Sequence, residues 1–123
     1  LRTKAPNDTY LVMNLSGGNQ QKVVISKVLA ADAEIIIMDE PTRGIDVGAK
    51  HEIYELMNEL CAEGKAIIMI SSDMEELLGM SDRVAVLYEH RYMGEIEKKD
   101  FSQELVLHLG SGYPAETFDP SHF

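Results

Sequence analysis

Two short stretches of the sequence carry residue types that can bind a phosphate group and a metal ion. The first is Ser16-Gly17-Gly18, which opens a region of helical spacing. A hydroxyl, two amides without side-chain cover and the positive end of a helix dipole together form an anion site. The alternative interpretation is an ordinary helix N-cap at Ser16 followed by a flexible glycine pair.

The second stretch is the apolar run at residues 35–38, which ends in Asp39-Glu40. Two carboxylates directly after a buried strand are typical of a magnesium-nucleotide site. There the first carboxylate holds hydrated Mg²⁺ and the next positions or deprotonates the attacking water. A solvated strand end or a helix cap is the alternative. Because both stretches occur in one chain and in this order, we favour a nucleotide site over the two structural alternatives.

Composition limits the class of protein. The chain has 123 residues, of which 45% are hydrophobic, and its formal net charge is −10. This length fits one modest domain or a piece of a larger one, and the acidity disfavours a nucleic-acid partner. The apolar runs are too short to span a membrane, and no signal-peptide pattern opens the sequence. The single cysteine, Cys61, excludes a disulfide framework and suits a reducing compartment.

Hydrophobic spacing predicts the elements that position these residues. Helices are expected at about residues 17–30, 47–62 and 103–109, with strands at 35–39 and 66–71. Strands alternating with helices indicate an α/β fold with a parallel sheet, and the continuous apolar runs predict strands buried on both faces. Ligands bind outside the carboxyl ends of such strands. Asp39 and Glu40 leave the first strand there, and Ser71, Ser72 and Asp73 leave the second.

Several boundary features are also predicted. Asp46 is a candidate N-cap for the helix at 47–62, and Gly64 can end that helix in a left-handed conformation. Residues 72–75 read as a capping box that begins with Ser72 and opens a short helix to about Gly79. A hairpin is expected to turn near residues 90–91, the tail from residue 110 is expected to be loose, and Cys61 is expected to be a small packed residue.

Four motifs together resemble the ATP-binding cassette (ABC) ATPases over roughly residues 12–98. "LSGGN" resembles the signature motif, with Asn19 where glutamine is commoner, and "IIIMDE" resembles the Walker B strand. "RGID" resembles the D-loop, and "ISSD" stands at the switch position, where a histidine usually precedes the acid. The resemblance implies a partial P-loop NTPase-like layered α/β fold without the P-loop strand. Residues 1–98 would be the C-terminal half of a nucleotide-binding domain, and residues 99–123 a C-terminal helix and loose tail.

The same segments are similar to one subgroup, the tandem-cassette ATPases that drive bacterial import of ribose, galactose or xylose. The resemblance is to the second cassette, which commonly has serine at the switch position, as Ser72 does here. It implies an ATP-binding and ATP-hydrolysing subunit at the cytoplasmic face of the inner membrane. Its partners would be the first cassette, the transmembrane permease subunits and, indirectly, a periplasmic sugar-binding protein. Because no G-x-x-x-x-G-K-[ST] pattern occurs, we expect a C-terminal fragment that is inactive alone.

The resemblance also implies a role for each candidate residue. In these ATPases two cassettes face each other head to tail around ATP. Asp39 would act on Mg²⁺, Glu40 would act on the water, Asp46 would cross to the partner, and Ser72 would take the switch position. The signature residues would contact the γ-phosphate of an ATP held by the partner cassette: Ser16, Gly17 and Gly18, with Asn19 and Gln20 beside them.

Two other functions remain as alternatives at this point. One is a soluble ABC ATPase of DNA repair, chromosome structure or translation, from which "DEPTRGID" and the acidic charge point away. The other is a remnant that has lost catalytic function, which the missing P-loop pattern makes a serious alternative. The sequence upstream of Leu1 would distinguish an importer from a remnant.

Overall fold

The chain divides into two compact units, Leu1–Ser71 and Ser72–Phe123, which are described separately. The computed structural model describes Lys27 and residues 32–122. The helix expected at about residues 17–30 therefore lies outside the described residues, apart from the helical Lys27. In the part of the chain that is described, no helix is long and apolar enough to cross a membrane.

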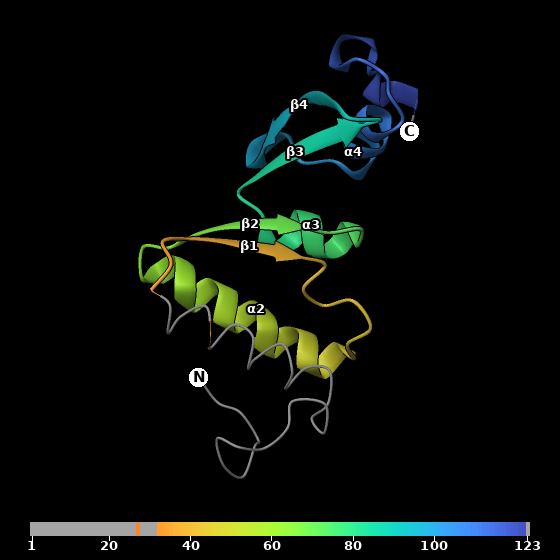
Figure 1. Cartoon of the computed structure of the whole chain (residues 1–123). Coiled ribbons are helices and arrows are strands. Elements are labelled where there is room, and N and C mark those ends of the chain that lie inside the picture. Colours follow the sequence, from red (N-terminus) through yellow and green to blue (C-terminus); the bar gives the residue numbers. More distant parts are fainter. Residues whose placement is uncertain (1–26, 28–31, 123) are drawn as a thin grey trace. The chain divides into compact units, whose positions relative to one another are not determined.

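Two parallel strands and one helix make up the described part of the first unit (Figure 1). Strands β1 (Ile35–Asp39) and β2 (Ala66–Ile70) pair in parallel, and α2 (Val47–Ala62) connects them. The register places Ile35 beside Ala66 and Asp39 beside Ile70, so both strands end at the same edge. The parallel α/β arrangement expected from the sequence is confirmed.

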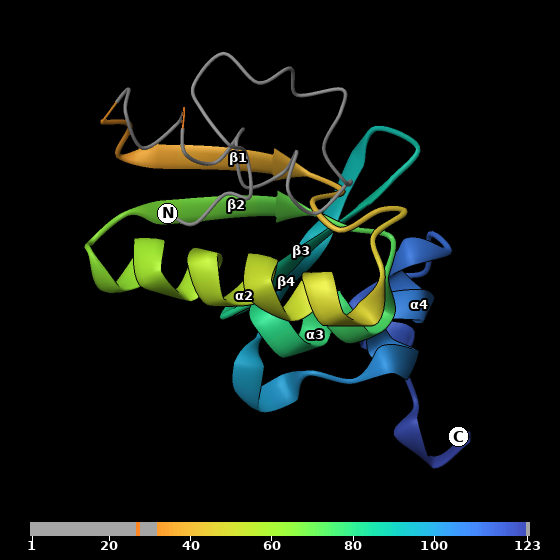
Figure 2. The ribbon, with the colours of Figure 1, turned by 90° about the horizontal axis from the view of Figure 1, so that it is seen from below.

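Helix α2 lies alongside the strand pair (Figure 2) and supplies half of the buried residues described in this unit. Its apolar stripe is buried as its spacing predicts: Ile53, Leu56, Met57 and Leu60. Full burial of one such side chain adds about 1.5–3 kcal/mol to the free energy of unfolding. The helix gives way to a turn in which Gly64 has a φ of 92°, the left-handed conformation that the sequence predicts.

The inner face of the strand pair is buried in β1 and half-buried in β2, and the other face is exposed, so the expectation of burial on both faces is wrong. Along β1 the side chains alternate, with Ile36 and Met38 buried and Ile35 and Ile37 exposed. The exposed fractions form one apolar surface across both strands: Ile35 64%, Ile37 67%, Ile68 54% and Ile70 51%. A continuous apolar run does not reveal how many faces are covered, because the sequence is the same in either case. We call these four residues the open sheet face.

The second unit is built on an antiparallel hairpin, β3 (Arg83–Tyr88) and β4 (Arg91–Glu97). The turn residues Glu89 and His90 have φ values of 44° and 66°, as in the tight turns that suit the right-handed strand twist. The hairpin is preceded by α3 (Met74–Met80) and followed by η2 (Lys98–Asp100) and α4 (Gln103–Gly110). Its buried core joins the hairpin to α4: Val84, Val86, Ile96, Val106 and Leu109.

The C-terminal tail is ordered, so the expectation of a loose segment is wrong. It contains the short helices η3 (Ala115–Thr117) and η4 (Pro120–His122). His108 Nε2 lies 2.9 Å from the Pro114 carbonyl and 3.0 Å from the Thr117 hydroxyl. Because that hydroxyl itself donates to the Pro114 carbonyl at 2.8 Å, both oxygens accept from His108 and Nε2 carries the proton. The rings of Tyr113 and Phe118 pack on the same imidazole, with centroids 5.4 and 5.3 Å away.

Two smaller expectations are also corrected. Helix α3 begins after Asp73, whose carboxylate accepts from the Glu76 N–H at 3.1 Å, so Asp73 is the N-cap and the capping box does not begin with Ser72. A carboxylate is as good an N-cap as a hydroxyl, and here it stands one residue closer to the apolar turn. Cys61 is exposed, because it lies between the buried positions of α2.

The open sheet face predicts that the isolated chain self-associates or is molten. Exposed apolar patches and unpaired strand edges both favour association. Replacing Ile37 and Ile68 together by lysine should reduce association, measured by light scattering, without loss of helical circular dichroism. In the matched control Ile36→Ala, a buried methyl cluster is lost and stability should fall by about 2–5 kcal/mol. A monodisperse wild-type monomer with a sharp cooperative melt would contradict this prediction.

Candidate functional site

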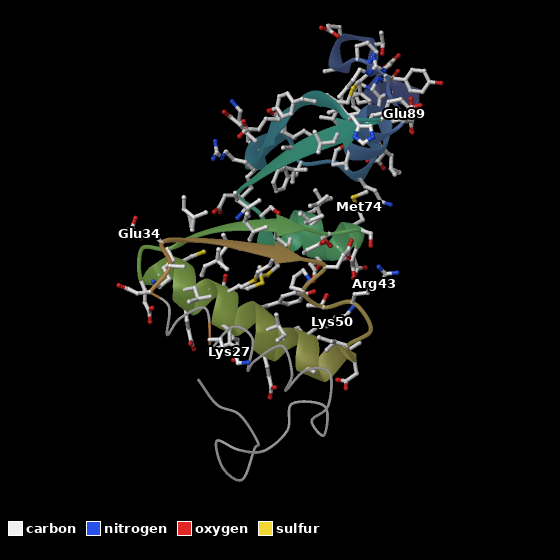
Figure 3. All side chains as sticks on the ribbon, in the orientation of Figure 1. Lys27, Glu34, Arg43, Lys50, Met74 and Glu89 are labelled. Atoms are coloured by element: carbon white, nitrogen blue, oxygen red, sulfur yellow. The ribbon has the colours of Figure 1, made fainter. Side chains whose placement is uncertain are left out.

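The carboxyl ends of β1 and β2 bring the candidate carboxylates to one edge of the sheet. Asp39 is the last residue of β1 and lies beside Ile70, the last residue of β2. The Glu40 N–H donates to the Ile70 carbonyl at 2.7 Å, which extends the pairing by one residue. Figure 3 labels Glu34, which directly precedes β1, and Arg43, which lies in the loop after it. Asp39 is exposed and Glu40 is partly buried, so both remain accessible from this edge.

The backbone of Glu40 is in the left-handed region, with a φ of 51°. Few residues other than glycine adopt this conformation, and such residues cluster at functional sites. Pro41 follows directly, and a residue before proline favours extended backbone instead. The chain thus makes an unfavourable turn at the residue to which the sequence assigns chemistry.

A tight loop leads from Glu40 to α2. The Arg43 N–H donates to the Glu40 carbonyl at 3.2 Å, and the Ile45 N–H donates to the Thr42 carbonyl at 3.1 Å. Within this loop Pro41 and Thr42 are buried, whereas Arg43 is exposed. The loop is therefore fixed from within by two turn bonds and by the burial of its first two residues.

Asp46 caps α2, as the sequence predicts. Its carboxylate oxygen Oδ1 accepts from the Ala49 N–H at 2.9 Å, and its carbonyl accepts from the Lys50 N–H at 3.0 Å. Asp46 is exposed, and its φ of −69° and ψ of 163° are those of an N-cap. A role for Asp46 in contact with another cassette stays a prediction.

The carboxylates at this edge suit Mg²⁺ better than a metal ion whose ligands all come from protein side chains. Among the residues that the structure describes, no three His, Cys, Asp or Glu side chains are grouped as metal ligands. Mg²⁺ is usually bound by one or two carboxylates together with waters and substrate phosphates. Asp39 and Glu40 supply carboxylates of that kind, and the remaining ligands would come from a nucleotide and water.

The other candidate residues are less fully described. The signature residues lie outside the described residues: Ser16, Gly17, Gly18, Asn19 and Gln20. Ser72 is exposed and is the first residue of the second unit, one position before the Asp73 N-cap. Its assignment to the switch position stays a prediction.

Sequence reasoning missed one feature of the site and one feature of the strands that carry it. One is the left-handed Glu40, whose position before Pro41 instead predicts extended backbone. The other is the link at the opposite end of the strands, where Lys65 Nζ donates to the Ala33 carbonyl at 2.9 Å and lies 3.7 Å from the Asp32 carboxylate. A lysine directly before a strand is the only sequence signal for that link.

The sequence is similar to a known family and to proteins of sugar import. The profile of the family described as ABC transporter matches residues 1–43. The ribose import ATP-binding protein RbsA of Clostridium perfringens is 56% identical over 112 residues, which is 91% of this chain and 22% of that protein. A putative ribose/galactose/methyl galactoside import ATP-binding protein of Rhizobium etli is 53% identical, over 91% of this chain and 21% of that protein. The chain thus spans about a fifth of the length of these relatives.

Solved structures share the fold. An ATP-binding cassette of an ABC transporter superposes with a TM-score of 0.68 at 25% identity, covering 85% of this chain and 40% of that one. A dimeric bacterial ABC transporter cassette superposes with a TM-score of 0.64 at 27% identity, covering 75% of this chain and 40% of that one. These likenesses confirm the partial P-loop NTPase-like α/β fold expected from the motifs.

The N-cap predicts a local effect of substitution at Asp46. Asp46→Ala removes the acceptor for the Ala49 N–H and should destabilise the start of α2 by about 0.5–2 kcal/mol. Hydrogen exchange of the first-turn amides should become faster, whereas amides of the last turn should change little. Asp46→Asn keeps the cap without the charge and should behave like the wild type. Equal loss of protection in both variants would show that charge, and not capping, is what stabilises this helix.

Proposed function

This chain belongs to the ATP-binding cassette ATPase family, and from that premise we propose that it is part of the subunit that powers monosaccharide import across a bacterial inner membrane. Within that subunit it is the C-terminal part of the second of two cassettes. The intact protein binds ATP with Mg²⁺ and hydrolyses it. The observation that carries this proposal is the 51–56% identity, over more than nine-tenths of this chain, to proteins named as ribose or ribose/galactose/methyl galactoside import ATP-binding proteins.

The geometry of the strand ends supports the chemistry. Asp39 would hold the metal ion through its carboxylate, and Glu40 would orient or deprotonate a water beside it. Mg²⁺ bound there would neutralise charge on the phosphates. Asp46 reaches the opposite cassette, and Ser72 takes the switch position. The signature residues serve the other ATP, which the partner cassette holds: Ser16, Gly17 and Gly18, with Asn19 and Gln20 beside them.

The partners follow from the same assignment. They are the first cassette of the same protein, the transmembrane permease subunits and, indirectly, a periplasmic sugar-binding protein. The subunit would then lie peripherally at the cytoplasmic face of the membrane. We keep residues 1–98 as the C-terminal half of a nucleotide-binding domain and residues 99–123 as a C-terminal helix and tail, of which the helix α4 packs on the hairpin β3–β4. The relatives' names favour import over DNA repair or translation, and they favour an ATP-binding subunit over a remnant.

Alone, the chain should hydrolyse no ATP and bind it weakly. It lacks the G-x-x-x-x-G-K-[ST] loop whose amides and lysine hold the phosphates, and its net charge of −10 repels a polyanion. Titration of the purified chain with Mg-ATP in a calorimeter tests this, with the intact protein as the positive control. Micromolar affinity or measurable turnover by the chain would contradict it.

The two ATP sites of the intact protein should be unequal. A switch histidine can contact both the γ-phosphate and the attacking water, whereas Ser72 is shorter and uncharged. Loss of one such group lowers kcat about 10²- to 10³-fold, so the site of Asp39 and Glu40 should hydrolyse ATP slowly. Ser16→Arg should block the other site by a clash with phosphate, and Glu40→Gln should harm transport less.

Sugar uptake and ATPase activity of both variants in the intact transporter measure this asymmetry. Ser16→Ala is the control that shortens the side chain without adding bulk. If Glu40→Gln abolishes both activities while Ser16→Arg leaves them near wild type, the asymmetry belongs to the opposite site.

A further inference from the structure

The left-handed backbone at Glu40 needs an explanation from its surroundings. A φ of 51° is unfavourable for a glutamate, and more so before Pro41. Such a conformation persists only where neighbouring contacts over-determine it. The conformation sets the direction in which the Glu40 side chain leaves the end of β1.

Contacts on both sides of Glu40 supply that restraint. Before it, its N–H is held by the Ile70 carbonyl at 2.7 Å, as the last bond between the strands. After it, its carbonyl accepts from Arg43, and the next turn closes where the Thr42 carbonyl accepts from Ile45. Thr42 thus belongs to both turns: it is the third residue of the turn 40–43 and the first residue of the turn 42–45.

Thr42 is also unusual in its burial. It is 3% exposed and is one of two buried polar or charged residues in the part of the chain that is described, the other being Glu76 in the second unit. Among the same described residues, every fully buried side-chain oxygen or nitrogen has a hydrogen-bond partner. A buried hydroxyl is costly unless it is paired, so its presence in this loop indicates that it fixes a conformation.

We propose that Thr42 is a positioning residue, whose buried side chain holds the turn that keeps Glu40 in its left-handed conformation. That Glu40 acts on water rests on the proposed function, but its restraint by Thr42 does not. The hydroxyl carries this restraint, because it fixes the orientation of the turn.

Hydrogen exchange of the intact protein tests the restraint itself. Thr42→Val keeps the shape and removes the hydroxyl, Thr42→Ser keeps the hydroxyl, and Arg43→Ala changes the exposed next residue. Thr42→Val should speed exchange of the Glu40, Arg43 and Ile45 amides about tenfold or more, since an unpaired buried partner is left behind. Thr42→Ser and Arg43→Ala should stay within about twofold of wild type.

Two results would overturn the proposal. One is that Thr42→Ser loosens the loop as much as Thr42→Val does. The other is that exchange rises equally through α2 and β2, which would mean that Thr42 only fills the core. Neither result depends on ATP hydrolysis, so a failure of the proposed function would be seen separately, as absence of ATPase activity in the wild-type intact protein.

A measurement of ATPase activity tests whether Thr42 affects the function of Glu40. In the intact protein, the glutamate of the first cassette that corresponds to Glu40 is replaced by glutamine, so that remaining turnover comes from the Glu40 site. There Thr42→Val should lower kcat about 10- to 100-fold at unchanged KM for ATP, as expected for a misplaced group. Thr42→Ser in the same background should leave kcat near the value measured with Thr42. Turnover that is above the Glu40→Gln background and unaffected by Thr42→Val would contradict the positioning role.

Discussion

The parallel register of β1 and β2 is the constraint on which the candidate site depends. Both strands are apolar at every position from 35 to 38 and from 66 to 70, so a slip of one residue would still place apolar side chains on both faces. Hydrophobicity therefore does not select the register. Hydrogen bonds hold the observed register at both ends: Lys65 Nζ and the Ala66 N–H bond to the Ala33 and Glu34 carbonyls, and the Glu40 N–H bonds to Ile70. The last of these bonds also holds the backbone of the catalytic candidate.

Local signals were sufficient to predict the elements of the fold. The apolar stripe of α2 and its Asp46 cap depend on residues within four positions of one another, and both were expected. The one-sided burial of β1 was not, because it depends on what packs against the strand and not on the strand's own residues. The site followed the same division. The sequence pattern singled out Asp39 and Glu40 as candidates, but the φ of Glu40 depends on contacts with Ile70 and a buried loop.

The tail shows why composition is a poor guide to order. Glycine, proline and serine suggested a loose segment, yet each has a defined place. Gly112 has a φ of 92°, and a Cβ there would lie 2.6 Å from the Tyr88 ring, so glycine is required for the tail to pass that ring. His108 bonds to residues six and nine positions further along. The N–H and hydroxyl of Ser121 both donate to Asp119, and these bonds lower the pKa of that carboxyl. A polar side chain with two acceptors and two rings around it can replace an apolar core in a short segment.

An acidic chain that serves an anionic nucleotide presents an electrostatic conflict, and the proposed arrangement resolves it by division. In that arrangement the carboxylates at the end of β1 would act where Mg²⁺ supplies the opposing charge, so their own charge would favour the metal and would not meet phosphate directly. The amides of the signature motif, which carry no charge, would act on a different ATP, held by the partner cassette. Each half-site would then be incomplete, and hydrolysis would require two cassettes to meet. The same arrangement would explain two exposed features, because other parts of a larger protein would then meet the carboxylate of Asp39 and the isoleucines of the open sheet face.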